Sequence, residues 1–328
     1  MVGLKKLLKK FTRLKNKRII TVTMNPVIDR TLFVPDFTAG TTMRVESARI
    51  LAAGKGVNVS RALKSLGIPT IATGILPKNG SSYYLSLLEK ESINSDFLIF
   101  DKDEPVRSNI TILSNNTNSE THLREKGPKL DIEALDLFKE KLTELSKSAD
   151  AVVFSGSLPL GLPDDSYERL IKNVKPIVKI TALDSSGPAL KMGIKSTPTL
   201  IKPNEIESRD ILGFKPDSIK NIHKSVNEYI NLGLHYIILS LGKAGLIYSD
   251  GSSIVKANIK IKNPVNSVGS GDASLAGGLL GIMADLPPSQ IAAFSCAMGA
   301  ANTLSYGACI IDLEALEDVY NMVNLETL

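Results

Sequence analysis

The chain has 328 residues, 43% of them hydrophobic, which is enough to bury a large core in one or two domains. Residues 1–18 hold 8 of the 39 basic residues and none of the 34 acidic ones, so the rest of the chain is slightly acidic and a nucleic-acid-binding body is not expected. Two cysteines in apolar surroundings, Cys296 and Cys309, and three scattered histidines argue against disulfide, zinc and haem sites and favour the reducing cytoplasm.

The first predicted element, in residues 1–18, is a basic amphipathic helix. Apolar residues recur at helical spacing with Lys and Arg between them, and no signal-peptide apolar run is present. Two interpretations stay open: a solvated extension, or a helix that lies on an anionic membrane surface or docks a partner. In both, the folded domain begins at residue 19.

Short apolar runs rich in β-branched residues predict buried parallel strands at 19–24, 70–76, 151–154, 177–183, 199–202 and 236–241. Between most of these runs, apolar residues every three or four positions predict helices at 57–66, 81–91, 132–148, 164–173 and 219–232. This alternation predicts an α/β fold with a mostly parallel central sheet and helices on both faces. No apolar stretch approaches the roughly 18 residues that a membrane span needs.

Two segments, at about 30–51 and 107–125, interrupt the alternation. Each contains two strand-like runs with no helix between them. They are interpreted as a small antiparallel β lid on the main sheet, although two ordinary surface hairpins would give the same pattern. Because no linker or repeat is present, residues 19–328 are expected to form one domain that includes this lid.

The sharpest local motif is Asn266-Ser-Val-Gly-Ser-Gly-Asp272, which precedes a helix predicted at 273–284. Small residues let several backbone N–H groups converge in front of a helix N-terminus, where an anion such as phosphate binds. A carboxylate at this point can accept the proton of an attacking hydroxyl in phosphoryl transfer. Ordinary turn and helix-cap chemistry explains the same residues, so this motif alone decides nothing.

Two further motifs lie at element starts: one precedes the predicted lid, and the other leads into the helix predicted at 57–66. Asp29 follows the first predicted strand, at the sheet edge where α/β proteins bind ligands, and it could hold sugar hydroxyls. The loop Gly54-Lys-Gly-Val-Asn58 allows close backbone approach, with Lys55 and Asn58 as polar groups. Its order is not that of a Walker A loop, which excludes the P-loop class. A plain strand-to-helix turn remains the alternative.

Two later loops also end predicted strands. In Lys202-Pro-Asn204-Glu-Ile-Glu207, Asn204 and Glu207 could face Mg²⁺ or its waters, or could simply cap a helix. Ser240-Leu-Gly242-Lys-Ala-Gly245 is either a β-turn or a shelf beneath a nucleotide. Together, these loops carry the groups that a phosphotransferase needs.

In this order, the motifs resemble those of the ribokinase-like sugar kinases of the phosphofructokinase B family, over nearly all of residues 19–325. Ser155-Gly-Ser-Leu-Pro159 and Asp184-x-Ser-Gly187 complete the series. The Asn25-Pro and Gly-Lys-Gly-x-Asn motifs are most similar to the hexose-phosphate branch, which includes 1-phosphofructokinase and tagatose-6-phosphate kinase. Ala53 and Ser270 depart from the usual residues, which leaves the fine substrate preference open.

The resemblance implies a role for each matching residue. Asp272 would be the catalytic base, and the backbone of Gly269, Ser270 and Gly271 would form the anion hole. Asn204 and Glu207 would organise Mg²⁺, largely through water. Residues at the sugar phosphate would be Asp29, Gly54, Lys55, Asn58 and Arg107. Residues along ATP would be Lys202, Asn204, Ser240, Gly242, Gly245 and Asn302.

The expected reaction is ATP-dependent phosphorylation of a ketohexose phosphate in the cytoplasm, with D-fructose 1-phosphate as the first choice of substrate. Tagatose 6-phosphate and fructose 6-phosphate are the nearest alternatives. A non-catalytic sugar-phosphate sensor and a membrane-tethered scaffold are alternatives of other classes, but neither needs the complete set of catalytic motifs. The small lid also offers a surface through which two copies could form a homodimer.

Overall fold

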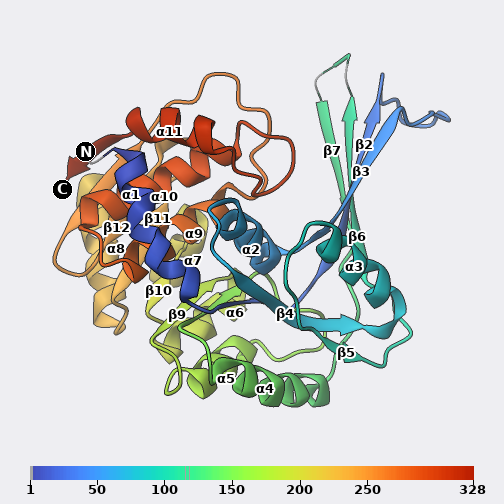
Figure 1. The fold of residues 1–328 in the computed structure, drawn as a ribbon, viewed down its shortest axis with the longest axis horizontal. Coiled ribbons are helices and arrows are strands. Elements are labelled where there is room, and N and C mark those ends of the chain that lie inside the picture. Colours follow the sequence, from blue (N-terminus) through green and yellow to red (C-terminus); the bar gives the residue numbers. More distant parts are fainter. Residues whose placement is uncertain (1–2, 115, 118) are drawn as a thin grey trace.

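The computed structural model describes residues 3–114, 116–117 and 119–328, which form a large and a small sheet (Figure 1). The strands of the large sheet lie in the order β14-β13-β12-β11-β10-β9-β8-β1-β4-β5. From β11 to β5 all neighbours are parallel, and the β14 to β11 end is antiparallel. In chain order the strands are β1 (Ile19–Thr23), β4 (Thr70–Pro77), β5 (Leu98–Phe100), β8 (Ala151–Ser155), β9 (Ile180–Asp184), β10 (Leu200–Ile201), β11 (Tyr236–Ser240), β12 (Leu246–Ser249), β13 (Ile254–Asn258) and β14 (Asn324–Thr327).

Helices cover both faces of this sheet, because alternate strand residues point to opposite sides. Ile19 faces one core and Ile20 faces the other. The first core is covered by α1 (Leu4–Phe11), α2 (Lys55–Ser65), α9 (Ser270–Met283), α10 (Pro288–Asn302) and α11 (Leu313–Asn321). The second is covered by α4 (Ile132–Ser146), α5 (Ser166–Val174), α6 (Gly187–Gly193) and α8 (Ile219–Asn231). The predicted α/β class and its six parallel strands are confirmed.

The predicted lid is a four-stranded sheet that projects from the body (Figure 1). Its strands are β2 (Val27–Val34), β3 (Ser47–Ala53), β6 (Arg107–Ser114) and β7 (Ser119–Arg124), in the order β3-β2-β6-β7. The outer pairs are antiparallel as expected, but β2 and β6 at the centre are parallel. The two strand-like segments are therefore one sheet and not separate hairpins.

The N-terminal helix corrects the expectation of an extension outside the domain. Its apolar stripe is part of the first core: the residues of this stripe, each at most 4% exposed, are Leu4, Leu7, Phe11 and Leu14. The ring centroid of Phe11 lies 5.0 Å from that of Phe294 on α10. The stripe that a membrane surface would need is thus already used in folding, and only the basic face points to solvent.

Among the described residues, no helix combines the length and the apolar character that crossing a bilayer requires.

Candidate active site

The predicted site residues gather at one edge of the large sheet. Thr23, Ser155, Asp184 and Ser240 end β1, β8, β9 and β11, and Lys202 directly follows β10. These strands are parallel, so their carboxyl ends meet at the same edge, where open α/β sheets bind ligands. The lid begins at this edge because β2 follows β1 after three residues.

The first turn of α9 has the geometry of an anion cradle. Gly269 precedes the helix with φ 87°, a left-handed conformation that favours glycine, and a Cβ there would lie 2.9 Å from the Cβ of Ala308. A Cβ on Gly271 would lie 3.1 Å from Lys202 Nζ, which brings a cation close to the turn. First-turn amides have no intrahelical acceptors and carry the positive end of the helix dipole. The turn is therefore suited to a phosphate group.

Asp272 lies in this turn with 5% of its surface exposed. Its Oδ2 accepts a hydrogen bond of 2.8 Å from Asn58 Nδ2. Burial raises the pKa of Asp272 to about 6, against the opposing effect of the Lys55 ammonium. A carboxylate with a raised pKa is a better proton acceptor near neutral pH than an ordinary surface aspartate.

Behind Asp272, one buried carboxylate holds two lysines. Asp184 Oδ1 lies 3.3 Å from Lys55 Nζ, and Asp184 Oδ2 lies 3.2 Å from Lys202 Nζ. Although burial opposes its ionisation, Lys202 and Lys55 together lower the pKa of Asp184. The carboxylate thereby fixes both cations beside the anion cradle. The sequence motif contained Asp184, but we did not predict it as a site residue, although its position at a strand end is the same signal that marks Lys202.

Asn302, which we predicted to lie along the nucleotide, has a fully buried side chain that is bonded within the protein. Its Nδ2 donates to the Val268 carbonyl at 2.9 Å and to Ser270 Oγ at 3.0 Å, and its Oδ1 accepts from the Cys309 amide at 2.6 Å. Asn302 thus holds the anion cradle from behind.

Asn204 and Glu207 form a capping box at the start of α7 (Glu205–Leu212). The backbone N–H of Asn204 donates to Glu207 Oε2 at 2.8 Å, and the side-chain Oδ1 of Asn204 accepts from two backbone amides of the first turn. Burial raises the pKa of Glu207. In the part of the chain that the structure describes, no group of three or more metal-ligating side chains lies together. Because Mg²⁺ keeps several waters and phosphate ligands, the single carboxylate of Glu207 fits contact with such an ion through water.

The lid side of the site contains Asp29 and Arg107. Burial raises the pKa of Asp29, whereas an Asn109 hydrogen bond and the Arg107 charge oppose this change. Arg107 Nη2 donates to the Asn25 carbonyl at 3.0 Å and its Nη1 to the Glu125 carbonyl at 3.2 Å. Within the described residues, buried polar atoms here lack hydrogen-bond partners: Asn25 Oδ1, Arg107 Nε and Asn109 Oδ1. Buried polar atoms of this kind are normally met by water, an ion or a ligand.

The remaining predicted loops are near the same edge. Gly54 has φ 133° before α2, and a Cβ there would lie 2.4 Å from Thr23 Cγ2. Ser240 Oγ donates to the Pro203 carbonyl at 3.3 Å, which joins two strand-end loops. A Cβ on Gly245 would lie 2.1 Å from the Ala257 carbonyl, so this glycine serves a close approach to β13, whereas Gly242 faces open space. Their contact with a nucleotide stays a prediction.

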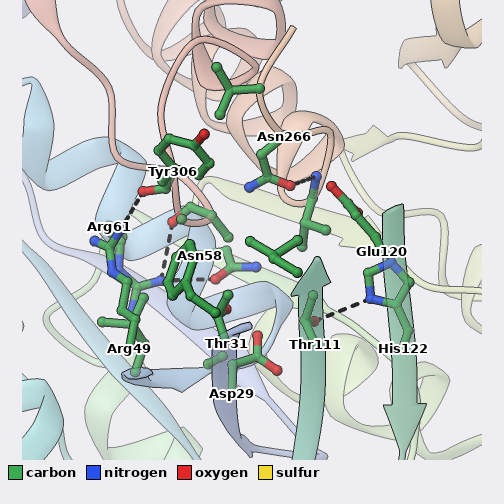
Figure 2. A pocket seen from close by; sticks show the side chains of 18 residues that line it. Asp29, Thr31, Arg49, Asn58, Arg61, Thr111, Glu120, His122, Asn266 and Tyr306 are labelled. Carbon is green, nitrogen blue, oxygen red and sulfur yellow. Dashed lines mark hydrogen bonds and ion pairs between the residues drawn. The ribbon is translucent and has the colours of Figure 1, made fainter. Parts of the chain in front are cut away.

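Figure 2 shows the cavity between the lid and the body, with Asp29 and Asn58 at its walls. The lid touches the opposite loop at Tyr306: Arg49 donates to its carbonyl, and the Phe33 ring lies edge-on to its ring with centroids 6.4 Å apart. These two contacts join the lid sheet to the Tyr306 loop beside the cavity.

A family model described as pfkB family carbohydrate kinase matches residues 21–316. The chain belongs to this family. It is 32% identical over 310 residues to a tagatose-6-phosphate kinase of Staphylococcus epidermidis, covering 94% of this chain and 99% of the relative. It is also 32% identical over 260 residues to a 1-phosphofructokinase of Borreliella burgdorferi, covering 79% and 83%.

Among solved structures, phosphofructokinase-2 from Escherichia coli in complex with potassium superposes with a TM-score of 0.86 at 23% identity, over 93% of this chain and 98% of that chain. The agreement shows a shared fold. Together with the pfkB family match, it confirms the ribokinase-like architecture and the membership expected from the motifs, and the protein is a carbohydrate kinase.

Proposed function

We propose that this kinase transfers the γ-phosphoryl group of ATP to a hydroxyl of a ketohexose phosphate, with D-fructose 1-phosphate giving D-fructose 1,6-bisphosphate as the first assignment. Asp272 takes the proton of the accepting hydroxyl. The oxygen of that hydroxyl bonds to the γ-phosphorus, and ADP leaves. The observation that carries the proposed phosphoryl transfer is the buried Asp272 in the first turn of α9, next to the Gly269 and Gly271 amides.

The charges around Asp272 support this chemistry. Two ammonium groups, Lys55 and Lys202, lie beside the cradle and are suited to compensating phosphate charge. Mg²⁺ bound to ATP would neutralise the same phosphates, with Glu207 and Asn204 placed to meet its water ligands.

The lid side supports an acceptor that already carries a phosphate. Arg107 brings a guanidinium with a buried, unpartnered Nε, and guanidinium groups bind phosphate through two parallel hydrogen bonds. Asp29, with Asn109 beside it, is suited to hold sugar hydroxyls.

Tagatose 6-phosphate is the second candidate acceptor, because the S. epidermidis relative that matches 94% of this chain is a tagatose-6-phosphate kinase. A panel of acceptors separates the candidates: ADP release from ATP and Mg²⁺ would be measured with fructose 1-phosphate, fructose 6-phosphate, tagatose 6-phosphate and free fructose. The highest kcat/KM with fructose 1-phosphate supports the first assignment. A preference of more than about tenfold for another ketohexose phosphate replaces it, and activity on free fructose alone overturns the phosphate requirement.

We further propose a cytoplasmic homodimer that pairs through the lid. Apolar residues remain exposed there, including Val45 at 46% and Leu123 at 54%. Light scattering of the intact protein measures its oligomeric state, and Leu123→Lys should shift that state toward the monomer.

A further inference from the structure

Arg61 is a buried cation that the expected chemistry does not use. It lies on α2, one turn after Asn58, and only 5% of its side chain is exposed. An arginine is rarely buried to this extent without a fixed set of partners. Its partners show what it holds in place.

The guanidinium connects four separate segments around the catalytic turn. Its Nε and Nη2 form a fork on the Glu91 carboxylate, with distances of 2.6 and 2.8 Å. Nη2 also donates to the Ala52 carbonyl at 2.7 Å, at the end of lid strand β3. Nη1 donates to Asn58 Oδ1 at 2.9 Å and to the Ala308 carbonyl at 3.4 Å (Figure 2).

The chemistry of these groups fixes the orientation of the Asn58 amide. A guanidinium is a donor only, so the Asn58 atom that faces Arg61 must be the acceptor Oδ1. The donor Nδ2 must then face the other way, toward Asp272 Oδ2 at 2.8 Å. A flipped amide would place an oxygen against the carboxylate and an N–H against the guanidinium, and both contacts would be repulsive.

We propose that Arg61, anchored by Glu91, is a positioning residue that acts through Asn58 to orient the carboxylate of Asp272 and keep it ionised for proton transfer. This inference rests on the proposed function, in which Asp272 is the base. Arg61 is not a catalytic residue in this scheme, because it contacts Asn58 and not the carboxylate itself.

Other charged groups around both residues are part of the same balance. The titratable groups that interact with Asp272 from neighbouring elements are Lys55, Asp184, Lys202 and Cys309. Those that interact with Arg61 are Glu91, Tyr84, Cys309 and Asp29. None of these is altered in the first test below, so a change in the pH profile reports the link through Asn58.

The test is the pH dependence of kcat at saturating ATP, Mg²⁺ and the best acceptor. Arg61→Lys keeps the charge opposite Glu91 but cannot form the fork and hold Asn58 at once. The acid limb of the profile is the range in which kcat falls as the pH falls. Its midpoint should move to a higher pH by roughly half to one unit, as expected for one hydrogen bond lost from a carboxylate. At pH 5, on the acid limb, kcat should fall about three- to tenfold, whereas at pH 7 it should fall less than about twofold. KM for ATP should change less than about twofold at both pH values.

A second variant covers the case in which Arg61→Lys does not fold. Arg61→Met combined with Glu91→Leu removes the whole ion pair without leaving a buried charge alone, and such replacements are often neutral for stability. It should move the acid limb in the same direction. Tyr84→Phe is the matched control: it removes a buried hydrogen bond of 2.8 Å to the Ala53 carbonyl beside the same lid strand, with no contact to Asn58. Its acid limb should not move.

The route through Asn58 is tested by a double-mutant cycle. In an Asn58→Leu background, Arg61→Lys should cause no further shift of the acid limb, because the amide that transmits the effect is gone. An equal shift in both backgrounds overturns the proposal, as does an unmoved limb in Arg61→Lys. If Asp272→Asn remains fully active, the base assignment itself fails. If Asp272→Asn is inactive but the Arg61 variants leave the limb unmoved, the role of Arg61 alone is refuted.

Discussion

The asparagine side chains on the two sides of the site differ in how completely they are hydrogen-bonded within the protein. Around the anion cradle, the amides of Asn58 and Asn302 each use both their oxygen and their nitrogen in hydrogen bonds within the protein. At the base of the lid, the described residues leave buried polar atoms of Asn25, Arg107 and Asn109 without partners.

In the function proposed above, this difference corresponds to a preformed catalytic side and a side that gains its partners when the substrate binds. Donors fixed before the reaction need no reorganisation in the transition state, which favours the cradle as the place of chemistry. Unpaired buried donors and acceptors cost free energy until a ligand meets them, which favours the lid as the place of recognition. Substitutions on the two sides should therefore have different kinetic signatures.

The largest effect is expected on the preformed side. Asp272→Asn keeps an amide of the same size but removes the proton acceptor, so kcat should fall by roughly 100-fold or more. Circular dichroism should show a folded protein. Asp312→Asn is the control. Asp312 also lies at a helix start, that of α11, and its Oδ1 accepts a hydrogen bond of 2.8 Å from the Ala315 backbone amide. Full activity of Asp272→Asn would reduce this residue to a structural role.

On the recognition side, Arg107→Ala should lower kcat/KM for the sugar phosphate by roughly ten- to a hundredfold, the range of one or two lost charged hydrogen bonds. KM for ATP should change little. The exposed Arg30→Ala on lid strand β2 is the matched control and should behave as wild type. An equal loss with free fructose would mean that Arg107 supports the lid rather than a substrate phosphate.

The pH profile refines the comparison further. A base works only when deprotonated, and burial raises the pKa of Asp272 to about 6. The value of kcat should therefore be constant well above pH 6 and should fall as the pH drops through this value. Well below pH 6, kcat should fall about tenfold per pH unit. Stopped-time assays of kcat between pH 4.5 and 8 measure this limb. A plateau that continues down to pH 4.5 would contradict the raised pKa.

The smallest effect on catalysis is expected far from both sides. Leu7→Ala on α1 removes a fully buried side chain from the first core, so the free energy of unfolding should fall by about 2–4 kcal/mol. In the folded fraction kcat/KM should be unchanged. Urea titration measures the stability, with the exposed Lys6→Ala as control. Unaltered stability of Leu7→Ala would show that α1 does not contribute to the core.

The sequence predicted the parts of the molecule that depend on local pattern. Buried strands are visible as short apolar runs, and the loops after their carboxyl ends made Asp29 and Lys202 candidates. Asp272 was a candidate because glycine-rich residues precede it at a predicted helix start. The strands β12 to β14 were missed because each has only four or five residues. In β13 and β14, half-exposed and exposed residues weaken the apolar pattern further.

Features that depend on distant contacts could not be predicted. Arg61 occupies a helix position where an arginine usually faces solvent, and only the arrival of Glu91 from α3 (Lys78–Lys90) and its flanking turn makes it a buried anchor. Asn302 carried no sign that its partners would be the Val268 carbonyl and the Cys309 amide. The parallel pairing of β2 with β6 likewise joins segments that are separated by α2, β4 and α3.

The docking of α1 has a consequence for biosynthesis. The helix packs against α10 and α11, which are translated only after almost all of the described chain has left the ribosome. Until then, the Phe11 ring lacks its partner Phe294, and α1 lacks α11. During this interval a basic helix with an uncovered apolar stripe is a natural ligand for chaperones that shield nascent chains. Its late docking closes a loop of nearly all the described residues, so formation of this part of the core should be among the slowest steps of folding.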